Sequence, residues 1–319
     1  LRALLAAAPA APSLRALVRD LLAGGDGAEL PAMKTRAHAE GLALSATVER
    51  GTPTNITADP HSFVGRAADL DALRERLASH RLVTLLGPGG TGKTRLAREF
   101  ALQSLDTVPH GGAWFVALDV ARTLEGVLHA VGLALDLPVN ETDPSAQIER
   151  IGRALAGRGR VLLLIDNVEQ VVEPAAAALA RWLDLAPLAR FIVTSRERLR
   201  LPGEDVLPLG PLDEESAVAL FVDRAQIARP GFTLTDDERP IVLDIVNRLD
   251  RIPLAVELAA ARVSALPPAK LRDRLDQRFR LLRGTARDVT ARQATLEGAI
   301  AWSWELLDPA ERHTLACRS

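Results

Sequence analysis

Short apolar runs and helix-type spacing alternate along the middle of the chain. Residues 82–86 (Leu-Val-Thr-Leu-Leu) and 161–165 (Val-Leu-Leu-Leu-Ile) are nearly unbroken apolar runs, as expected for strands that are buried on both faces of a parallel sheet. Shorter runs of the same kind lie at 113–118, 191–194 and 206–209. Helical spacing of apolar residues predicts helices at 66–80, 94–105, 124–135, 146–155 and 174–185. Five apolar strands separated by helices predict an α/β fold with a five-stranded parallel sheet.

The pattern becomes wholly helical after about Pro211. Residues 235–238 (Thr-Asp-Asp-Glu) have the spacing of a capping box, which starts a helix, and residues 253–263 form a compact Ala-rich helix. Two further helix starts lie at Thr290 and Asp308. We therefore expect one α/β domain over residues 61–211 and an all-helical bundle over residues 212–285.

The first 60 residues divide into a helical segment and a polar segment. Residues 1–46 are rich in Ala, Leu and Arg, and Leu14, Leu17 and Leu21 share one face at helical spacing. This segment is either an adaptor that docks a partner helix or the tail of an upstream domain, and the sequence favours neither reading. Residues 47–60 are polar and contain two prolines, so we expect a linker there.

Composition limits the kinds of protein that the chain can be. A chain of 319 residues is too long for one typical core, so two or three domains are expected. Its 48% hydrophobic and 25% charged residues are typical of soluble globular proteins. The formal net charge of −2 provides no general attraction to nucleic acid or to an anionic membrane.

Cysteine content and the two chain ends bear on location. Cys317 is the single cysteine, so no intrachain disulfide can form, and a reducing compartment, the cytoplasm, is expected. No apolar run approaches the roughly 20 residues that span a bilayer, and the start lacks a secretory signal pattern. The chain has no initiator Met and stops within a helical pattern, so we expect it to be a piece of a longer protein.

A glycine-rich motif follows the first strand. Residues 87–94 match the pattern G-x-x-x-x-G-K-[ST] in full. Glycines let the backbone wrap a phosphate with its N–H groups pointing inward, and the N-terminus of the following helix adds partial positive charge. The residues expected to hold the phosphates are Gly87, Pro88, Gly89, Gly90, Thr91, Gly92, Lys93 and Thr94.

The last two residues of this motif have separate roles. We expect the Lys93 ammonium to contact the β- and γ-phosphates and the Thr94 hydroxyl to ligate Mg²⁺. Lysine occurs at only two other positions, 34 and 270, whereas the remaining basic residues are Arg. The motif therefore predicts a nucleotide ligand, ATP or ADP, together with Mg²⁺.

Two later strands end in polar residues that the same ligand could use. Asp166 follows the run at 161–165, and a carboxylate at the carboxyl end of a buried parallel strand faces the ligand crevice. We expect Asp166 to hold Mg²⁺, directly or through water. Glu169 either orients an attacking water or is a solvated helix-start residue. Arg196 either contacts the γ-phosphate or lies on the surface of an Arg-rich chain.

These motifs together resemble the STAND class of signal-transduction ATPases, relatives of the NB-ARC proteins within the AAA+-like P-loop group. The particular resemblance is to the bacterial AfsR-like regulators, and it covers roughly residues 61–316. Residues 165–169 (Ile-Asp-Asn-Val-Glu) resemble the family's second phosphate motif, and residues 194–197 (Thr-Ser-Arg-Glu) resemble its sensor segment. The resemblance implies catalytic roles for Lys93, Asp166, Glu169 and Arg196.

Two further segments resemble family motifs that contact the base of the nucleotide. Residues 62–66 (Ser-Phe-Val-Gly-Arg) resemble the family's entry motif, which implies that Val64, Gly65 and Arg66 lie beside the adenine. Ala67 stands where many relatives have Glu. Residues 251–255 (Arg-Ile-Pro-Leu-Ala) resemble the G-L-P-L-A motif, whose proline, here Pro253, packs against the base. Arg251 replaces the usual Gly.

The resemblance also implies an architecture and a mode of action. The expected fold is the five-stranded sheet, then the helical bundle, then a winged helix that starts in residues 286–319, where Trp302 and Trp304 lie. In relatives ADP holds a closed state, and exchange for ATP opens the molecule and often promotes assembly. The implied partners are therefore the nucleotide and other protein chains or further copies of this one, and hydrolysis is expected to be slow.

Three functions fit these residues. The leading one is a nucleotide-driven regulatory switch with weak ATPase activity. A work-performing ATPase is the second, although only 3% of residues are aromatic and no basic stripe with interleaved aromatics is present, which argues against a nucleic-acid motor. The third is a nucleotide-binding scaffold without hydrolysis. Direct nucleic-acid binding is not inferred, and no pair among the six histidines has helical metal-ligand spacing.

Overall fold

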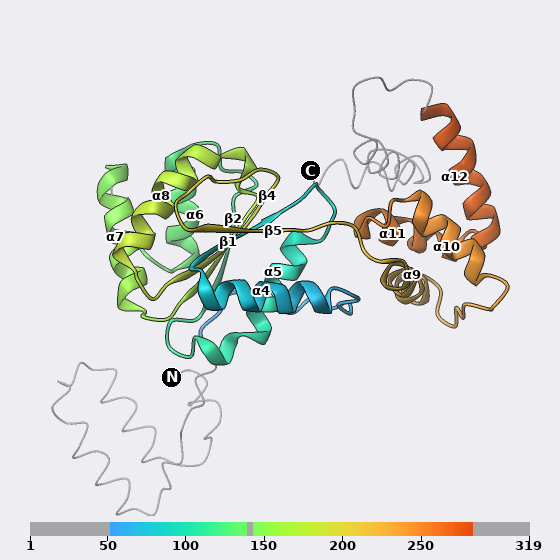
Figure 1. The fold of residues 1–319 in the computed structure, drawn as a ribbon, viewed down its shortest axis with the longest axis horizontal. Coiled ribbons are helices and arrows are strands. Elements are labelled where there is room, and N and C mark those ends of the chain that lie inside the picture. Colours follow the sequence, from blue (N-terminus) through green and yellow to red (C-terminus); the bar gives the residue numbers. More distant parts are fainter. Residues whose placement is uncertain (1–51, 139–142, 283–319) are drawn as a thin grey trace, which may run out of the picture. The chain divides into compact units, whose positions relative to one another are not determined.

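A five-stranded sheet with all neighbouring strands parallel forms the centre of the α/β part (Figure 1). The structure, a computed structural model, describes the backbone of residues 52–138 and 143–282 and the side chains of these residues up to residue 275. The strand order is β2-β3-β4-β1-β5. The strands are β1 (Leu82–Leu86), β2 (Ala113–Ala117), β3 (Leu162–Asp166), β4 (Arg190–Ser195) and β5 (Glu204–Pro208). The predicted five-stranded parallel α/β fold is confirmed.

Helices cover both faces of the sheet (Figure 1). They are α4 (Ala67–Ser79), α5 (Lys93–Gln103), α6 (Leu124–Ala134), α7 (Pro144–Gly157) and α8 (Val172–Leu185), with short 3₁₀ turns at Leu105–Thr107 and Val168–Gln170. Leu163 and Ile165 of β3 pack in the core cluster that contains α6, α7 and α8, whereas Leu162 and Leu164 pack in the cluster that contains α4 and α5. Since successive side chains of a strand point to opposite faces, a strand buried on both sides needs an unbroken apolar run.

The fifth strand begins two residues before the predicted start at residue 206. It opens with Glu204 and Asp205, which hydropathy alone assigns to a loop. The Glu204 carboxylate accepts a hydrogen bond from the Thr84 hydroxyl at 2.7 Å and from the amide N–H groups of Leu199 and Arg200. Because β5 is an edge strand, polar side chains can remain in it when they find partners of this kind.

Residues 53–56, inside the predicted linker, run beside β2. The amide of Ala113 donates to the carbonyl of Pro53 at 3.0 Å, and Thr54 forms an isolated parallel bridge with Ala113. The Asn55 side chain exchanges two hydrogen bonds with the backbone of Phe115, and Ile56 is buried in the core. The end of this segment is therefore tied to the sheet, and the boundaries assigned to the domains stay predictions.

The described part of the helical region has its own core. Its elements are α9 (Glu214–Ala228), α10 (Arg239–Arg248), α11 (Pro253–Ala260), a 3₁₀ turn (Ala261–Ser264) and α12 (Pro268–Leu282). Fully buried Phe221 and Phe232 lie in this core, and Val64 of the entry segment packs against it. The predictions for residues 1–46 and for the winged helix at 286–319 lie outside the described residues.

Local sequence signals mark two of the helix starts in the structure. Asp143 is the N-cap of α7 and accepts a hydrogen bond from the Ser145 amide, with Pro144 as the first helical residue. The Thr235 hydroxyl accepts a bond from the Glu238 amide at 3.3 Å, as in a capping box, although α10 itself begins at Arg239. Among the described residues, no helix combines the length and apolar character needed to cross a membrane.

The turn between α10 and α11 has a backbone shape that suits the Gly of the G-L-P-L-A motif at the position of Arg251. Asp250 and Arg251 have φ angles of 51° and 53°, in the left-handed region. The amide of Arg251 donates to the Val246 carbonyl at 2.9 Å, which closes the end of α10. A side chain in this conformation is strained by contact between Cβ and the following carbonyl oxygen, whereas Gly adopts it without strain.

Arg251→Gly is therefore expected to stabilise the protein. Relief of the left-handed strain outweighs the larger backbone entropy that Gly has in the unfolded chain, for a net gain of about 0.5–1 kcal/mol. The 3.5 Å contact of Arg251 with Glu214 is half-exposed and contributes little. Urea unfolding measures the change. Arg248→Gly, at the end of α10, is the matched control and should lose about 1 kcal/mol; equal losses in both variants would contradict the strain.

Candidate functional site

The glycine-rich loop connects β1 to α5 at the carboxyl edge of the sheet. Gly92 is the N-cap of α5 and has a φ of 89°, which favours glycine. Lys93 is the first helical residue, so the helix begins inside the motif rather than at residue 94 as predicted. The first amide groups of a helix have no intrahelical partner, and here they open toward the loop. Such an arrangement binds anions.

Lys93 is held over the loop by the loop's own backbone. Its Nζ donates to the carbonyl oxygens of Gly87 at 2.8 Å and Pro88 at 3.0 Å, and the residue is buried. Burial lowers the pKa of Lys93, an effect that Glu169 opposes through its negative charge, while the charge of Arg196 lowers the pKa further. An ammonium group has three N–H donors, so Lys93 can donate a further charge-assisted hydrogen bond to a phosphate oxygen.

Asp166 receives hydrogen bonds from two threonine hydroxyls. Thr94 Oγ1 lies 2.7 Å from Asp166 Oδ1, and Thr194 Oγ1 donates to the same oxygen. Thr194 in turn accepts the Asn167 amide at 3.1 Å. Thr94 and Asp166 thus place a hydroxyl and a carboxylate side by side, and Mg²⁺ prefers such hard oxygen ligands. The donor set fits the predicted ion. In the described part of the chain, no group of three His, Cys, Asp or Glu residues could hold a metal.

Glu169 and Arg196 form an ion pair at the same edge. Glu169 Oε1 lies 3.1 Å from Arg196 Nε. The second oxygen of Glu169, Oε2, is buried and has no hydrogen-bond partner, which is costly unless another group such as a bound water satisfies it. Arg196 is 60% exposed, so its guanidinium is accessible to a ligand. The structure brings the two residues together, and their catalytic roles stay predictions.

A cavity of about 390 Å³ joins these groups to an apolar wall. Its size is that of a pocket for a small molecule. The predicted residues that line it are Val64, Arg66, Gly89, Gly90, Thr91, Gly92, Lys93, Thr94, Glu169, Arg196 and Pro253. Four predicted residues do not line it: Gly65, Gly87, Pro88 and Asp166. Gly87 and Pro88 contact Lys93 instead.

Several lining residues were missed by the sequence analysis. Phe63 and Leu254 adjoin predicted residues within the two base-side motifs, so those motifs could have indicated them. Leu212 and Leu220 carry no local signal, because they reach the cavity only through the packing of α9 and of the segment just before it. The other missed residues are Arg95, Asn167 and Glu257.

The entry segment is fastened to the phosphate loop and to α9. Arg66 donates to the carbonyl oxygens of Thr91 at 3.0 Å and Gly210 at 2.6 Å, so it positions the loop as well as lining the cavity. At Gly65 a Cβ would lie 2.8 Å from the Cβ of Ser216 in α9. Gly65 therefore permits close packing of the segment and does not itself reach the cavity.

The helical region contributes directly to the site. The amide of Leu254 donates to the Gly90 carbonyl at 3.2 Å, so α11 is bonded to the phosphate loop. Glu257 Oε1 accepts hydrogen bonds from Arg95 of α5 at 3.1 Å and from Arg224 of α9 at 3.0 Å. Pro253, Leu254 and Glu257 form one side of the cavity, and the loop forms the other.

Lys93→Met tests the electrostatic state of the buried lysine in protein without nucleotide. Because burial lowers the folded-state pKa, the unfolded chain binds this proton more tightly, and stability rises with pH over this range. We expect the wild type to gain unfolding free energy relative to Lys93→Met as pH rises through the folded pKa, up to about 10.4, the unfolded value. Urea unfolding at several pH values measures the difference; a difference independent of pH would contradict the lowered pKa.

Comparison with known proteins gives relatives of two sizes. An uncharacterized protein of Mycobacterium tuberculosis is 36% identical over 270 residues, which cover 84% of this chain and 67% of that protein. A protein named as an HTH-type transcriptional regulator from the same organism is 39% identical over 250 residues, 75% of this chain but 27% of the regulator. The regulatory protein AfsR of Streptomyces griseus is 31% identical over 281 residues, 82% of this chain and 27% of AfsR. The chain thus spans about a quarter of the length of these two regulators.

Solved structures agree on the fold. Cdc6p of Pyrobaculum aerophilum superposes with a TM-score of 0.50 at 15% identity, over 73% of this chain and 71% of that one. Identity this low supports similarity of fold alone.

The family model for the AAA domain matches residues 76–200, the stretch that contains the glycine-rich loop, Asp166 and Arg196. The same segment and the helical region after it are shared with the mycobacterial proteins and with AfsR. The chain belongs to a family of proteins with an AAA-type P-loop ATPase domain that includes AfsR-like regulators.

Proposed function

We propose that the chain is the ATP- and ADP-binding switch of a larger bacterial regulatory protein of the cytoplasm, with slow ATP hydrolysis. One observation carries this proposal: the cavity has the phosphate loop on one side and residues of α11 on the other, joined by the Leu254–Gly90 hydrogen bond. A nucleotide there would contact both parts of the chain. It can favour one arrangement over another to the extent that its contacts differ between the two arrangements.

Each group at the carboxyl edge has a place in hydrolysis. Lys93 and the loop amides would bind the phosphates, and Thr94 with Asp166 would hold Mg²⁺, which would offset the negative charge of the phosphates. Glu169 would accept a hydrogen bond from water and orient it toward the γ-phosphorus, with ADP as the leaving group. Arg196 would contact the γ-phosphate and so distinguish ATP from ADP.

Lys93→Ala is expected to lose nucleotide binding. Charge-assisted hydrogen bonds contribute about 1.5–3 kcal/mol each, so loss of the contact with the β-phosphate should lower ADP affinity in the presence of Mg²⁺ at least about tenfold. Calorimetric titration measures it. Lys270→Ala removes an exposed lysine at the start of α12 and should bind ADP normally. Normal affinity in Lys93→Ala would count heavily against the proposal.

Glu169→Gln separates binding from hydrolysis. Loss of a general base or water-orienting group lowers rates by about 10²–10⁴-fold, while ADP affinity should change little because the amide keeps the shape of the side chain. Phosphate release in single turnovers measures the rate. Glu173→Gln, at an exposed position in the first turn of α8, is the control and should hydrolyse at the wild-type rate.

The same measurements discriminate the other two functions. ADP binding with no phosphate release from the wild type would favour a scaffold, a reading supported by the pairing of Glu169 with Arg196 in this structure. Turnover well within the usual enzyme range of about 1–10³ s⁻¹, stimulated by DNA, would favour a work-performing ATPase. Protein partners or self-assembly in the ATP state belong to the switch proposal, and direct DNA binding does not.

A further inference from the structure

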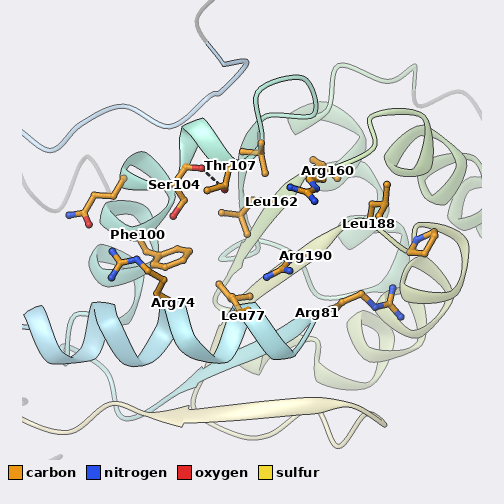
Figure 2. Close-up of a pocket in the computed structure, with 15 residues that line it drawn as sticks. Arg74, Leu77, Arg81, Phe100, Ser104, Thr107, Arg160, Leu162, Leu188 and Arg190 are labelled. Atoms are coloured by element: carbon orange, nitrogen blue, oxygen red, sulfur yellow. Dashed lines mark hydrogen bonds between the residues drawn. The ribbon is translucent and has the colours of Figure 1, made fainter.

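A second cavity lies at the amino ends of the strands, at the sheet edge opposite the glycine-rich loop (Figure 2). Its volume is about 510 Å³, within the range of small-molecule pockets. It is walled by α4, by the end of α5, and by the segments that enter β1, β3 and β4. Four of its lining residues are arginines and none is acidic: Arg74, Arg81, Arg160 and Arg190.

The four arginines differ in whether their side chains already have hydrogen-bond or ion-pair partners. Arg74 pairs with Asp71, one turn earlier on α4. Arg81 donates to the carbonyl of Leu183 at 2.7 Å and so satisfies the end of α8. The side chains of Arg160 and Arg190 are exposed, and no hydrogen-bond or ion-pair partner for either occurs within residues 52–138 and 143–282. These two guanidinium groups are therefore available to a ligand.

Strand pairing brings the two available arginines together. β3 and β4 are neighbours, with Leu162 opposite Arg190, and the Arg190 amide donates to the Val161 carbonyl at 2.9 Å. Arg160 directly precedes Val161. Figure 2 shows Arg160 and Arg190 on the same side of the cavity, with Leu162 and Leu77 nearby.

The charge around this cavity is positive even when nearby negative groups are included. Four helices, α4, α5, α7 and α8, end near this edge, and each helix C-terminus carries about half a negative charge. Asp71 adds one negative charge beside Arg74. Four guanidinium groups exceed these contributions by about one charge, although the whole chain has a net charge of −2. The cavity therefore favours anions.

The rest of the lining is apolar. Leu77, Phe100 and Leu162 are 3–5% exposed and form the inner wall. Leu188 stands at the rim and is 58% exposed, one of few large apolar side chains so exposed among the described residues. A ligand that fills this cavity needs an apolar body as well as negative charge.

We propose that this cavity binds a small phosphomonoester with an apolar body. A phosphoryl group carries nearly two negative charges at neutral pH and three acceptor oxygens, which matches two neighbouring guanidinium forks. The phosphoryl group would lie between Arg160 and Arg190, and the apolar body would lie against Leu77, Phe100 and Leu162. The recessed volume suits a small molecule better than the surface of a macromolecule.

Calorimetric titration with phenyl phosphate tests the site in protein saturated with ADP and Mg²⁺, so that the glycine-rich loop is filled. Loss of charge-assisted hydrogen bonds should weaken binding by at least about tenfold in the double variant Arg160→Gln, Arg190→Gln. Arg153→Gln, which removes an equally charged, exposed side chain on α7, should bind as the wild type does. Inorganic phosphate, which lacks the apolar body, should bind more weakly than phenyl phosphate.

Binding of phenyl phosphate should persist in Lys93→Ala, which makes this test independent of the nucleotide proposal. Three results with phenyl phosphate would overturn the inference: no binding at millimolar concentration, equal weakening in Arg153→Gln and the double variant, or loss of binding in Lys93→Ala. Capture of an acidic peptide by Arg160 and Arg190 without binding of phenyl phosphate would likewise overturn it, in favour of a protein partner. Thermal unfolding of the double variant checks that the fold is retained.

Discussion

The carboxylate of Asp166 connects three elements that lie far apart in the sequence. It ends β3, accepts a hydrogen bond from Thr94 at the start of α5, and accepts another from Thr194 near the end of β4. Asp166 is only 6% exposed, and a buried carboxylate is tolerated only when its oxygens find hydrogen-bond donors. The position of the phosphate loop relative to the sheet therefore depends on these bonds, and so does the separation of Lys93 from Glu169 and Arg196.

Polar contacts join the α/β part of the described chain to the helical bundle. The sheet with its helices and the bundle of α9 to α12 each bury their own apolar side chains. Between them lie the Leu254–Gly90 backbone bond and the Glu257 carboxylate, which accepts bonds from Arg95 and Arg224. Polar interfaces of this kind rearrange more easily than a shared apolar core. This property suits a site in which a ligand contacts both parts.

The two edges of the sheet differ in charge for a reason that lies in the topology. Every parallel strand ends at one edge, where α5 begins and its unpaired amides face the phosphate loop. At the opposite edge α4, α5, α7 and α8 end, and their last carbonyls are partly negative. Arg81 offsets part of that negative charge by donating to the Leu183 carbonyl of α8. The positive charges of Arg160 and Arg190 are not used to pair with a helix end.

The sequence by itself determined the class of fold, the strands and the phosphate loop. Local sequence is enough to predict the conformation of three segments. Unbroken apolar character indicates buried strands at 82–86 and 161–165, and the spacing of the glycines indicates a phosphate-binding loop at 87–94. The AfsR-like family could be inferred from those motifs, because their spacing along the chain is itself the signature.

Only the tertiary structure decided which distant residues meet. Leu212 and Leu220 line the cavity beside the glycine-rich loop because α9 and the segment just before it pack there. Glu204 can belong to a strand because the Thr84 hydroxyl donates to its carboxylate. Arg160 and Arg190 become neighbours through the register of β3 and β4. Local sequence patterns indicate which helix or strand a residue belongs to and which of its faces is buried. These contacts depend instead on strand order and helix packing, which are determined by interactions along the whole chain.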